Sequence, residues 1–396
     1  MGKTTIEAGM DVALKNKKDV LRGKRVATIV NHTAVTRDLV SFYDIAKESK
    51  DFTLAYLYSP PHGVRGDAQD SEEEYHIDKK TGVPVYPSYS LRLQDSATTM
   101  KEHHIDAIVF DIQNAGARYY GHKFVMCFAM EAAAKAGVEV IVLDRPNPIG
   151  PLPAEGEVLD LEFRSGIGWF EIPNVHGMTH GELATMFNAE HNVGCDLTVV
   201  KMEGWNHGMW YEDTGLFWPV ISPNLPTVDS VVTYAGTCLF EGCNISEGRG
   251  TTRPFEIVGA PWLDAKAMAE ELNSRNLPGV KFGEAYFIPT PNPLPHFSKF
   301  AGEKCQGVRI YVTDRMQYQP VRTAVHLLEA TMRADPERFK WREKSKDARH
   351  YPIDILAGSD DLRTKLEAGI PADDIVDAWK TKTEKFKEKR KNYMLY

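Results

Sequence analysis

The segment from Glu241 to Glu256 concentrates side chains that can donate or accept protons and bind polar groups. It holds several carboxylates, three hydroxyls, an amide, and an arginine between two glycines. Because glycines disfavour a helix and permit backbone conformations that other residues avoid, we expect a loop shaped around a ligand. The alternative is an internal ion pair that only holds the loop in place. The candidate residues here are Asn244, Ser246, Glu247 and Arg249.

Further polar side chains follow four predicted strands, at residues 25–31, 53–58, 107–112 and 138–143. These apolar runs alternate with amphipathic helical segments, which is typical of a parallel sheet covered on both faces. Ligands of such sheets lie beyond the carboxyl ends of the strands, so we expect the following loops to converge on one site. The residues concerned are Asn31, His62, Arg65, Asp111, Gln113, Arg118, Asp144, Arg145 and Asn147.

Several motifs are absent from the sequence, and their absence excludes particular kinds of cofactor site and catalytic site. No G-x-G-x-x-G follows the first strand and no G-x-x-x-x-G-K-[ST] occurs, so neither a dinucleotide nor a P-loop nucleotide is expected. G-x-S-x-G and H-E-x-x-H are also absent, and the histidines and cysteines lack the spacing of metal ligands. We therefore predict no metal site.

What remains is carboxylate and histidine chemistry in a setting rich in arginine and aromatic residues. Glycoside hydrolysis needs a proton donor for the leaving oxygen, and a 2-acetamido sugar can supply its own nucleophile. The candidate acids are Asp111, Asp144, Glu241 and Glu247. Glu247, His62 and Asp111 are the residues that we expect to transfer protons. A carboxylate after a strand could instead accept loop N–H bonds, and a lone histidine is often structural. The arginines named above could clamp a substrate carboxylate or pair with carboxylates of the protein itself.

The composition of the chain limits which binding partners and which cellular compartment can be expected. Its 396 residues carry a net charge of -8, which argues against nucleic acid as a partner. Five scattered cysteines without a C-x-x-C pair predict reduced, mostly buried thiols. No apolar run is long enough to cross a bilayer, and the first residues lack the apolar core of a signal peptide. We expect a cytoplasmic protein from the chain as given, in which a signal peptide already removed would leave no trace.

The sequence pattern changes near residues 150–156, which predicts a first domain over 1–155 and a second over 156–396. A helix is expected from about Thr179, with Glu182 completing its capping box. Another helix over 228–240 leads into the polar segment described first. Strands near 281–288 and 307–312, followed by helices, complete the predicted α/β fold.

A series of longer motifs runs along nearly the whole chain. Among them are Asn31-His32-Thr33, Asp144-Arg145-Pro146-Asn147-Pro148, His176-Gly177-Met178-Thr179 and Ser222-Pro223-Asn224-Leu225-Pro226-Thr227, with further matches at 21–26, 59–66, 110–113, 116–118, 244–252, 354–358 and 393–396. In this combination and order the sequence resembles the exo-β-N-acetylmuramidase family of peptidoglycan-recycling glycosidases, formerly described as a domain of unknown function.

The resemblance implies a Rossmann-like N-terminal domain, a C-terminal α/β domain and an active cleft between them. It implies release of N-acetylmuramic acid from the non-reducing end of peptidoglycan fragments, with a small saccharide or muropeptide as substrate and no cofactor. The lactyl carboxylate of that sugar would account for the arginines. His176 and Asn224 join the candidate substrate-binding residues on the strength of their motifs.

One departure from the family pattern concerns the proton donor. The family loop reads Ser-Pro-Glu-His-Gly, and the resemblance would make its glutamate catalytic, but this chain has Pro61 there, which can neither donate nor accept a proton. Asn114 also stands where an aspartate is common, and Gly121-His122-Lys123 replaces Thr-Tyr-Ile. Three hypotheses follow: the acid has moved, the cleft binds saccharides without turnover, or the enzyme acts on another sugar.

Overall fold

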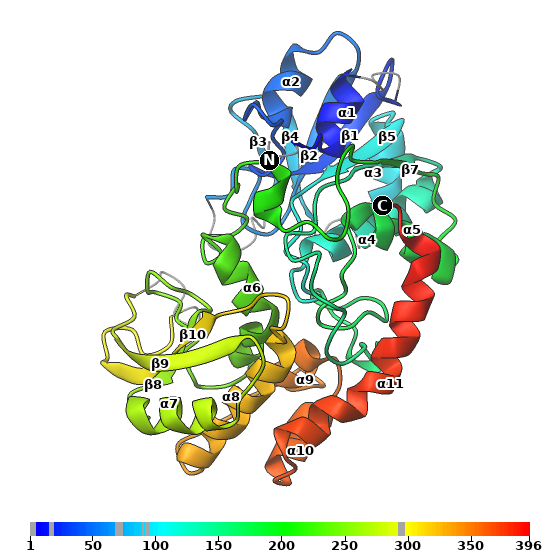
Figure 1. The fold of residues 1–396 in the computed structure, drawn as a ribbon. Helices are drawn as coiled ribbons and strands as arrows, with labels where there is room; N and C mark the ends of the chain where they lie inside the picture. Colours follow the sequence, from blue (N-terminus) through cyan, green and yellow to red (C-terminus); the bar gives the residue numbers. More distant parts are fainter. Residues whose placement is uncertain (1–4, 16–19, 68–73, 89–90, 92–95, 292–297) are drawn as a thin grey trace.

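The computed structural model describes residues 5–15, 20–67, 74–88, 91, 96–291 and 298–396. Within these residues the chain forms two units, built on a seven-stranded and a three-stranded sheet. Figure 1 shows the first unit above the second, with the last long helix running beside both. The predicted α/β class and the division into two α/β parts are confirmed.

The larger sheet has the strand order β3-β4-β2-β1-β5-β6-β7. All neighbouring pairs are parallel except β3 with β4. Four strands lie where the sequence predicted them, whereas β7 comes from beyond residue 155 and pairs with β6. The boundary predicted at residues 150–156 therefore falls inside the span of this sheet, because a short strand of four residues gave no clear signal. The strands are β1 (Arg25–Val30), β2 (Thr53–Ser59), β3 (His76–Ile77), β4 (Pro84–Pro87), β5 (Ala107–Asp111), β6 (Glu139–Leu143) and β7 (Leu197–Val200).

Five α-helices pack around this sheet: α1 (Gly9–Lys15), α2 (Phe42–Glu48), α3 (Ser96–Glu102), α4 (His122–Ala136) and α5 (His180–Glu190). Helix α4 ends at Gly137, whose φ of 72° suits glycine and whose N–H donates to the Ala133 carbonyl. Helix α5 has the predicted capping box between Thr179 and Glu182. Both helices lay a buried apolar face on the sheet, which fixes the loops at its carboxyl edge.

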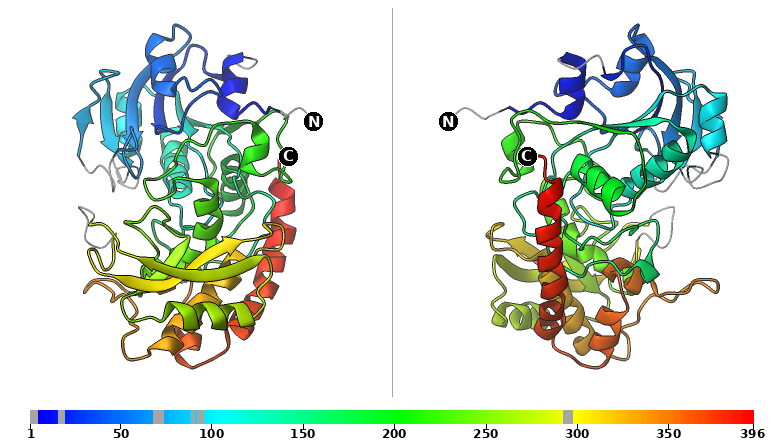
Figure 2. Two further views of the ribbon diagram at one scale, coloured as in Figure 1. Left: turned by 60° about the vertical axis from the view of Figure 1, so that its left-hand side comes forward. Right: turned by 90° about the vertical axis from the view of Figure 1, so that its right-hand side faces the viewer.

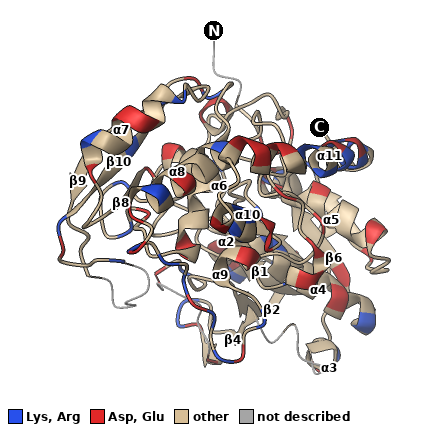
Figure 3. Ribbon diagram, turned by 90° about the horizontal axis from the view of Figure 1, so that it is seen from below, with Lys and Arg blue, Asp and Glu red and all other residues tan. Residues whose placement is uncertain are grey.

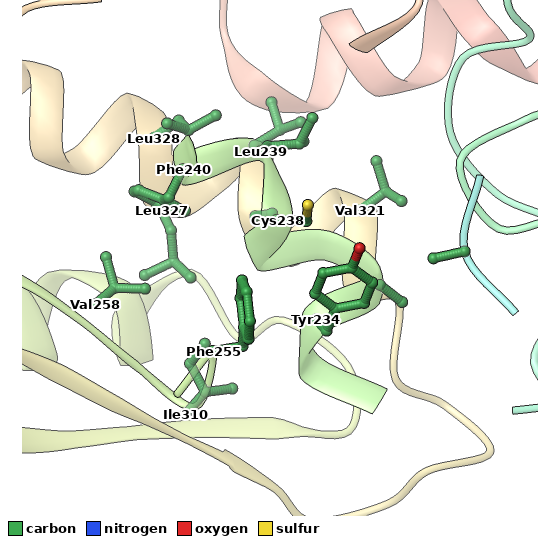
Figure 4. Close-up of a cluster of buried hydrophobic side chains, with 14 of the residues drawn as sticks. Tyr234, Cys238, Leu239, Phe240, Phe255, Val258, Ile310, Val321, Leu327 and Leu328 are labelled. Atoms are coloured by element: carbon green, nitrogen blue, oxygen red, sulfur yellow. The ribbon is translucent and has the colours of Figure 1, made fainter. Parts of the chain in front are cut away.

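The second unit begins with α6 (Val228–Thr237), which tightens into the 3-10 helix η5 (Cys238–Gly242) where the sequence predicted a continuous helix. Side chains of this segment share one buried cluster with residues of the small sheet and of α8 (Pro320–Ala334). Figure 4 shows Tyr234, Leu239 and Phe240 of the segment in this cluster, together with Phe255 from the loop before the small sheet. The order of strands is β8-β10-β9. The elements are β8 (Ile257–Ala260), α7 (Ala265–Ser274), β9 (Val280–Phe287), β10 (Cys305–Val312), α8 (Pro320–Ala334), α9 (Pro352–Ala357), α10 (Asp361–Glu367) and α11 (Ala372–Arg390), with 3-10 turns at Leu161–Phe163, Tyr211–Thr214 and Lys391–Tyr393.

Helix α11 ties the two units together, as both views of Figure 2 show. The Trp379 indole donates to Asp361 of α10, and the Thr383 hydroxyl donates to the Gly156 carbonyl of the first unit. Farther along, Lys389 pairs with Glu190 of α5 at 2.9 Å. Trp379 and Phe386 are buried on one face, so the lysines form the solvated side, and Figure 3 shows both charge signs along the helix.

All five cysteines are free and buried, as predicted from their spacing. Within the described residues, no helix combines the length and the apolar character that crossing a membrane requires.

Candidate active site

Loops of the first unit and the start of the second enclose a cavity of about 270 Å³. It combines histidines, tyrosines, one carboxylate and one arginine, and it is the place where the predicted residues His62 and Arg249 come together. Among the described residues, no group of three or more His, Cys, Asp or Glu side chains could hold a metal ion. The polar and aromatic residues that line the cavity are His62, Tyr119, Tyr120, His122, Ser222, Tyr234, Cys238, Glu241, Arg249 and Phe255, and Pro61 lies among them.

His62 occupies the loop after β2 with φ of 69°, a left-handed conformation that is uncommon for a residue with a side chain. Its Nε2 lies 3.2 Å from the hydroxyl oxygen of Ser222, so the two can share a proton. Gly66 closes the loop with φ of 74°, and a Cβ there would collide with the ring of His32. The loop thus presents an imidazole to the cavity directly beside Pro61.

His122 is the second imidazole at the cavity and begins α4. It is buried, its Nδ1 has no hydrogen-bond partner among the described residues, and its ring meets that of Tyr120 edge-on at 4.7 Å. Burial, with a smaller contribution from His62, lowers the pKa of His122 well below its ordinary value. The ring is therefore neutral and can either donate or accept a hydrogen bond.

Tyrosines form the aromatic wall of the cavity. The Tyr120 hydroxyl donates to the Ile221 carbonyl at 2.9 Å, and the Tyr119 hydroxyl donates to the Ala235 carbonyl. The rings of Tyr119 and Tyr234 meet edge-on at 5.5 Å. Burial raises the pKa of all three hydroxyls, so they stay protonated. Flat rings of this kind suit the apolar face of a sugar.

The charged wall comes from the segment that the sequence singled out. Arg249 pairs with Glu241 at 2.8 Å and with Glu247 at 3.4 Å, and it lies over the ring of Phe255. Glu241 lines the cavity, whereas Glu247 is 1% exposed and pairs on its other oxygen with Lys299 at 2.6 Å. Burial alone would raise the pKa of Glu247, but Lys299 and Arg249 hold it below its ordinary value. An ionised, buried carboxylate of this kind is a poor proton donor.

Asp111 and Arg145 form a buried ion pair at the carboxyl edge of the first sheet. Arg145 donates to both carboxylate oxygens of Asp111, one of them at 2.8 Å, and to the Val35 carbonyl at 2.9 Å. The Asp111 charge outweighs burial and raises the pKa of Arg145, so the pair stays ionised. Neither residue lines the cavity, which leaves Asp111 without access to a sugar there.

A second buried network orders the loops around this pair. Asp144 accepts from the Thr179 hydroxyl at 2.6 Å, the Gly181 N–H at 2.9 Å and the Tyr396 hydroxyl at 2.8 Å, and burial raises its pKa to about 6. Three further predicted residues serve the backbone in the same way: the Asn31 side chain accepts from Thr33, Gln113 donates to the Pro146 carbonyl, and Asn147 donates to the Met178 carbonyl.

Arg118 joins the two units through backbone carbonyls. It is fully buried and donates to the carbonyls of Glu157 and Ile172 in the first unit and to those of Leu356 and Ala357 at the end of α9. Burial lowers the pKa of its guanidinium to about 10. Both terminal nitrogens of Arg118 donate to backbone carbonyls, and the residue does not line the cavity, so it supports the cavity walls without touching a ligand there.

The other predicted residues also have structural partners. Arg65 pairs with Asp78 at 2.7 Å, and the buried His176 accepts from the Met178 N–H. Asn244 pairs with the backbone of residues 338 and 340. The Ser246 hydroxyl accepts from the Gly248 N–H, and the Asn224 N–H points to the Ser222 hydroxyl at 3.5 Å. None of these residues lines the cavity.

Sequence reasoning missed several lining residues, and two signals could have found them. Tyr234 and Cys238 are four residues apart, which places them on one helical face with Glu241, a residue that the sequence had already named as a candidate acid. His122 belongs to the triplet that departs from the family pattern. No sequence pattern indicated that Tyr119 and Ser222 line the cavity, because only folding of the chain brings them together there.

Comparisons with known proteins agree along the whole chain. Family models described as exo-beta-N-acetylmuramidase NamZ match residues 26–229 with the N-terminal part and 232–396 with the C-terminal part. Peptidoglycan beta-N-acetylmuramidase NamZ of Bacillus subtilis (strain 168) is 42% identical over 395 residues, covering 100% of this chain and 92% of that protein. Crystal structures of two DUF1343 family proteins from Bacteroides fragilis superpose with TM-scores of 0.89 and 0.78, at 34% and 30% identity, each covering 99% of both chains. The chain therefore belongs to the exo-beta-N-acetylmuramidase NamZ family of muramidase-like glycosidases.

Proposed function

We propose that this protein hydrolyses β-N-acetylmuramides, releasing N-acetylmuramic acid from the non-reducing end of peptidoglycan fragments. The observation that carries the proposal is the cavity, whose His62, His122 and Glu241 supply proton-transfer groups beside tyrosine walls. The relative from B. subtilis is named a peptidoglycan beta-N-acetylmuramidase, and the match covers the whole of this chain.

His62 is our candidate for the proton donor. Pro61 fills the family position of the glutamate, and His62 is the neighbouring group that lines the cavity and shares a hydrogen bond with Ser222. The Glu241 carboxylate, oriented by Arg249, can balance positive charge at the anomeric carbon. With a 2-acetamido substrate, the sugar's own amide oxygen supplies the nucleophile.

Hydrolysis of a chromogenic β-N-acetylmuramide by the purified protein tests this proposal. Turnover should fall by about 10²–10⁴-fold in His62→Asn, the contribution of a positioned general acid. His104→Asn is the matched control, because His104 is exposed and also has a positive φ, at 51°. Asparagine tolerates that conformation, so backbone strain is the same in both variants. Equal turnover in the two variants would remove His62 from the mechanism.

A saccharide-binding protein without turnover is the second candidate, and Pro61 favours it. Proline at this wall offers no proton, so the cavity could hold the sugar and leave the glycosidic bond intact. A Pro61→Glu variant decides between the two. Turnover in the variant alone supports the binding protein, whereas turnover in the wild type supports the hydrolase.

A further inference from the structure

The carboxylate clamp that the sequence predicted is occupied by the protein itself. Arg65 pairs with Asp78, and Arg145 pairs with Asp111. The guanidinium of Arg118 donates hydrogen bonds to backbone carbonyls. Arg249 reaches the cavity but is held between Glu241 and Glu247. A carboxylate-bearing sugar therefore needs a cation from elsewhere.

A second cavity of about 470 Å³ adjoins the first and contains such a cation. The two cavities share Ile167, Glu241 and Leu356 as lining residues. The second is lined mainly by the chain between 342 and 356, including Arg342, Glu343, Lys344 and His350. A ligand that passes Glu241 would meet these residues next.

The guanidinium of Arg342 has no carboxylate partner among the residues that the structure describes. Its backbone is fixed, because its N–H donates at 2.8 Å to the carbonyl of Gly242, the last residue of the 3-10 helix that carries Glu241. Lys344 adds a second positive charge, and within the described part of the chain its ammonium donates only to the Arg349 carbonyl, at 3.4 Å. Glu343 and Glu241 are the carboxylates that line this cavity, and Glu241 is paired with Arg249.

His350 supplies a further polar atom in the same wall. Its ring lies 4.2 Å from that of Phe163, and its Nε2 is buried without a hydrogen-bond partner among the described residues. Buried polar atoms are normally satisfied, so an unpartnered one at a cavity wall indicates a place for a ligand atom. The wall thus offers two cations and one imidazole nitrogen.

We propose that this second cavity is an anion subsite in which Arg342 binds a carboxylate of the saccharide ligand. Guanidinium binds carboxylates through two parallel hydrogen bonds, whereas Lys344 adds an undirected charge. This inference rests on the proposed saccharide ligand and adds the residue that distinguishes a muramic acid derivative from a neutral 2-acetamido sugar. The carboxylate is either the lactyl group of the sugar or the end of an attached peptide.

Binding measured by calorimetry separates these cases. The ligands are N-acetylmuramic acid, N-acetylglucosamine, and an N-acetylmuramoyl dipeptide whose lactyl group is an amide and whose one carboxylate lies on the peptide. The wild type should prefer at least one acidic ligand over N-acetylglucosamine by about tenfold or more, as expected for a charge-assisted pair. Preference for the free sugar acid identifies the lactyl group, and preference for the dipeptide identifies the peptide end.

The variant Arg342→Ala should lose that preference and keep the affinity for N-acetylglucosamine, which also shows that the cavity is intact. Arg338→Ala is the control, because Arg338 lies on the same segment, pairs with Asp335 at 3.5 Å and lines neither cavity. An unchanged preference in Arg342→Ala, equal loss of all three ligands, or no preference in the wild type would overturn the inference. Because this experiment measures binding and not turnover, a protein that binds the sugar without hydrolysing it can still meet the prediction. The proposed hydrolysis and the proposed anion subsite can therefore fail independently.

Discussion

Two acidic residues of one segment differ in what surrounds them. Glu241 reaches a cavity with one arginine beside it, whereas Glu247 is enclosed between Arg249 and Lys299. Removing one partner from a buried pair leaves the other charge uncompensated, which costs more than the pair itself contributes. We therefore expect Glu247 to act on stability.

Glu247→Gln should lower the free energy of unfolding at pH 7 by about 3 kcal/mol, measured by denaturant titration. The pKa of Glu247 is lower in the folded than in the unfolded state, so the folded state binds fewer protons and stability rises with pH. The contribution is complete above about pH 5 and is lost as pH falls through the folded pKa. The exposed Glu270 provides the control, Glu270→Gln. Unchanged stability with lost turnover would instead restore Glu247 as the acid.

The sequence located the site better than it assigned the residues. The loops after the strands do converge, because carboxyl ends of parallel strands share one edge. Whether Arg118 or Arg145 meets a ligand depends on which carbonyl or carboxylate lies within 3 Å, and residue spacing along the chain holds no such distance. His62 was predicted as a candidate because two glycines mark its loop as a tight turn. This local pattern can be recognised from the sequence alone.

At the scale of elements, the change from α6 to the 3-10 helix η5 positions Tyr234, Cys238 and Glu241 along the cavity. Close packing against α8 holds α6 there, because Gly236 has no side chain. A Cβ at Gly236 would lie 1.9 Å from the carbonyl oxygen of Pro320, the first residue of α8. The two helices approach each other through this contact.

Gly236→Ala tests that approach. Helix propensity alone predicts a gain of about 1 kcal/mol from this substitution. Overlap with the Pro320 carbonyl should reverse the sign and destabilise the protein by ~1–3 kcal/mol, because the backbone of α8 has to move. Thermal unfolding gives the sign directly, and a higher midpoint would contradict the packing described here.

Strand prediction succeeded where strands have five residues or more and are mostly apolar, as β1, β2, β5 and β6 are. It missed β3, β4, β7 and β8, which have two to four residues and gain their hydrogen bonds only from neighbours already in place. The missed β7 lies beyond the boundary predicted at residues 150–156. A tertiary contact, not local pattern, decided the extent of the first unit.

At the scale of the whole molecule, the units share buried links. Arg118 donates to carbonyls on both sides, and α11 contacts α10 and α5. Gly358 is required beside this link, since a Cβ there would lie 2.6 Å from a guanidinium nitrogen of Arg118. The cavity walls are thus held at a fixed separation before any ligand arrives.

Calorimetry should therefore record one unfolding transition for both units in the wild type. Arg118→Ala removes the four hydrogen bonds of the guanidinium and leaves the Glu157 and Ala357 carbonyls without a donor among the described residues, so we expect a loss of ~3 kcal/mol or more and separation into two transitions. The Ile172 and Leu356 carbonyls keep the Leu159 N–H and the Asn174 amide as donors. The exposed Arg333 offers the control variant Arg333→Ala. A single transition at an unchanged midpoint in Arg118→Ala would show that the units do not depend on this link.

Helix α11 has a further consequence for how ligand preference can change. It sets the spacing of the two units, yet none of its residues lines either cavity. Substituting Trp379 or Phe386 on the buried face of α11 should tilt the helix and so change the width of the proposed saccharide cavity. Every residue that lines the cavity would stay the same. Ligand preference can thus depend on a packing surface that lies away from the cavity walls.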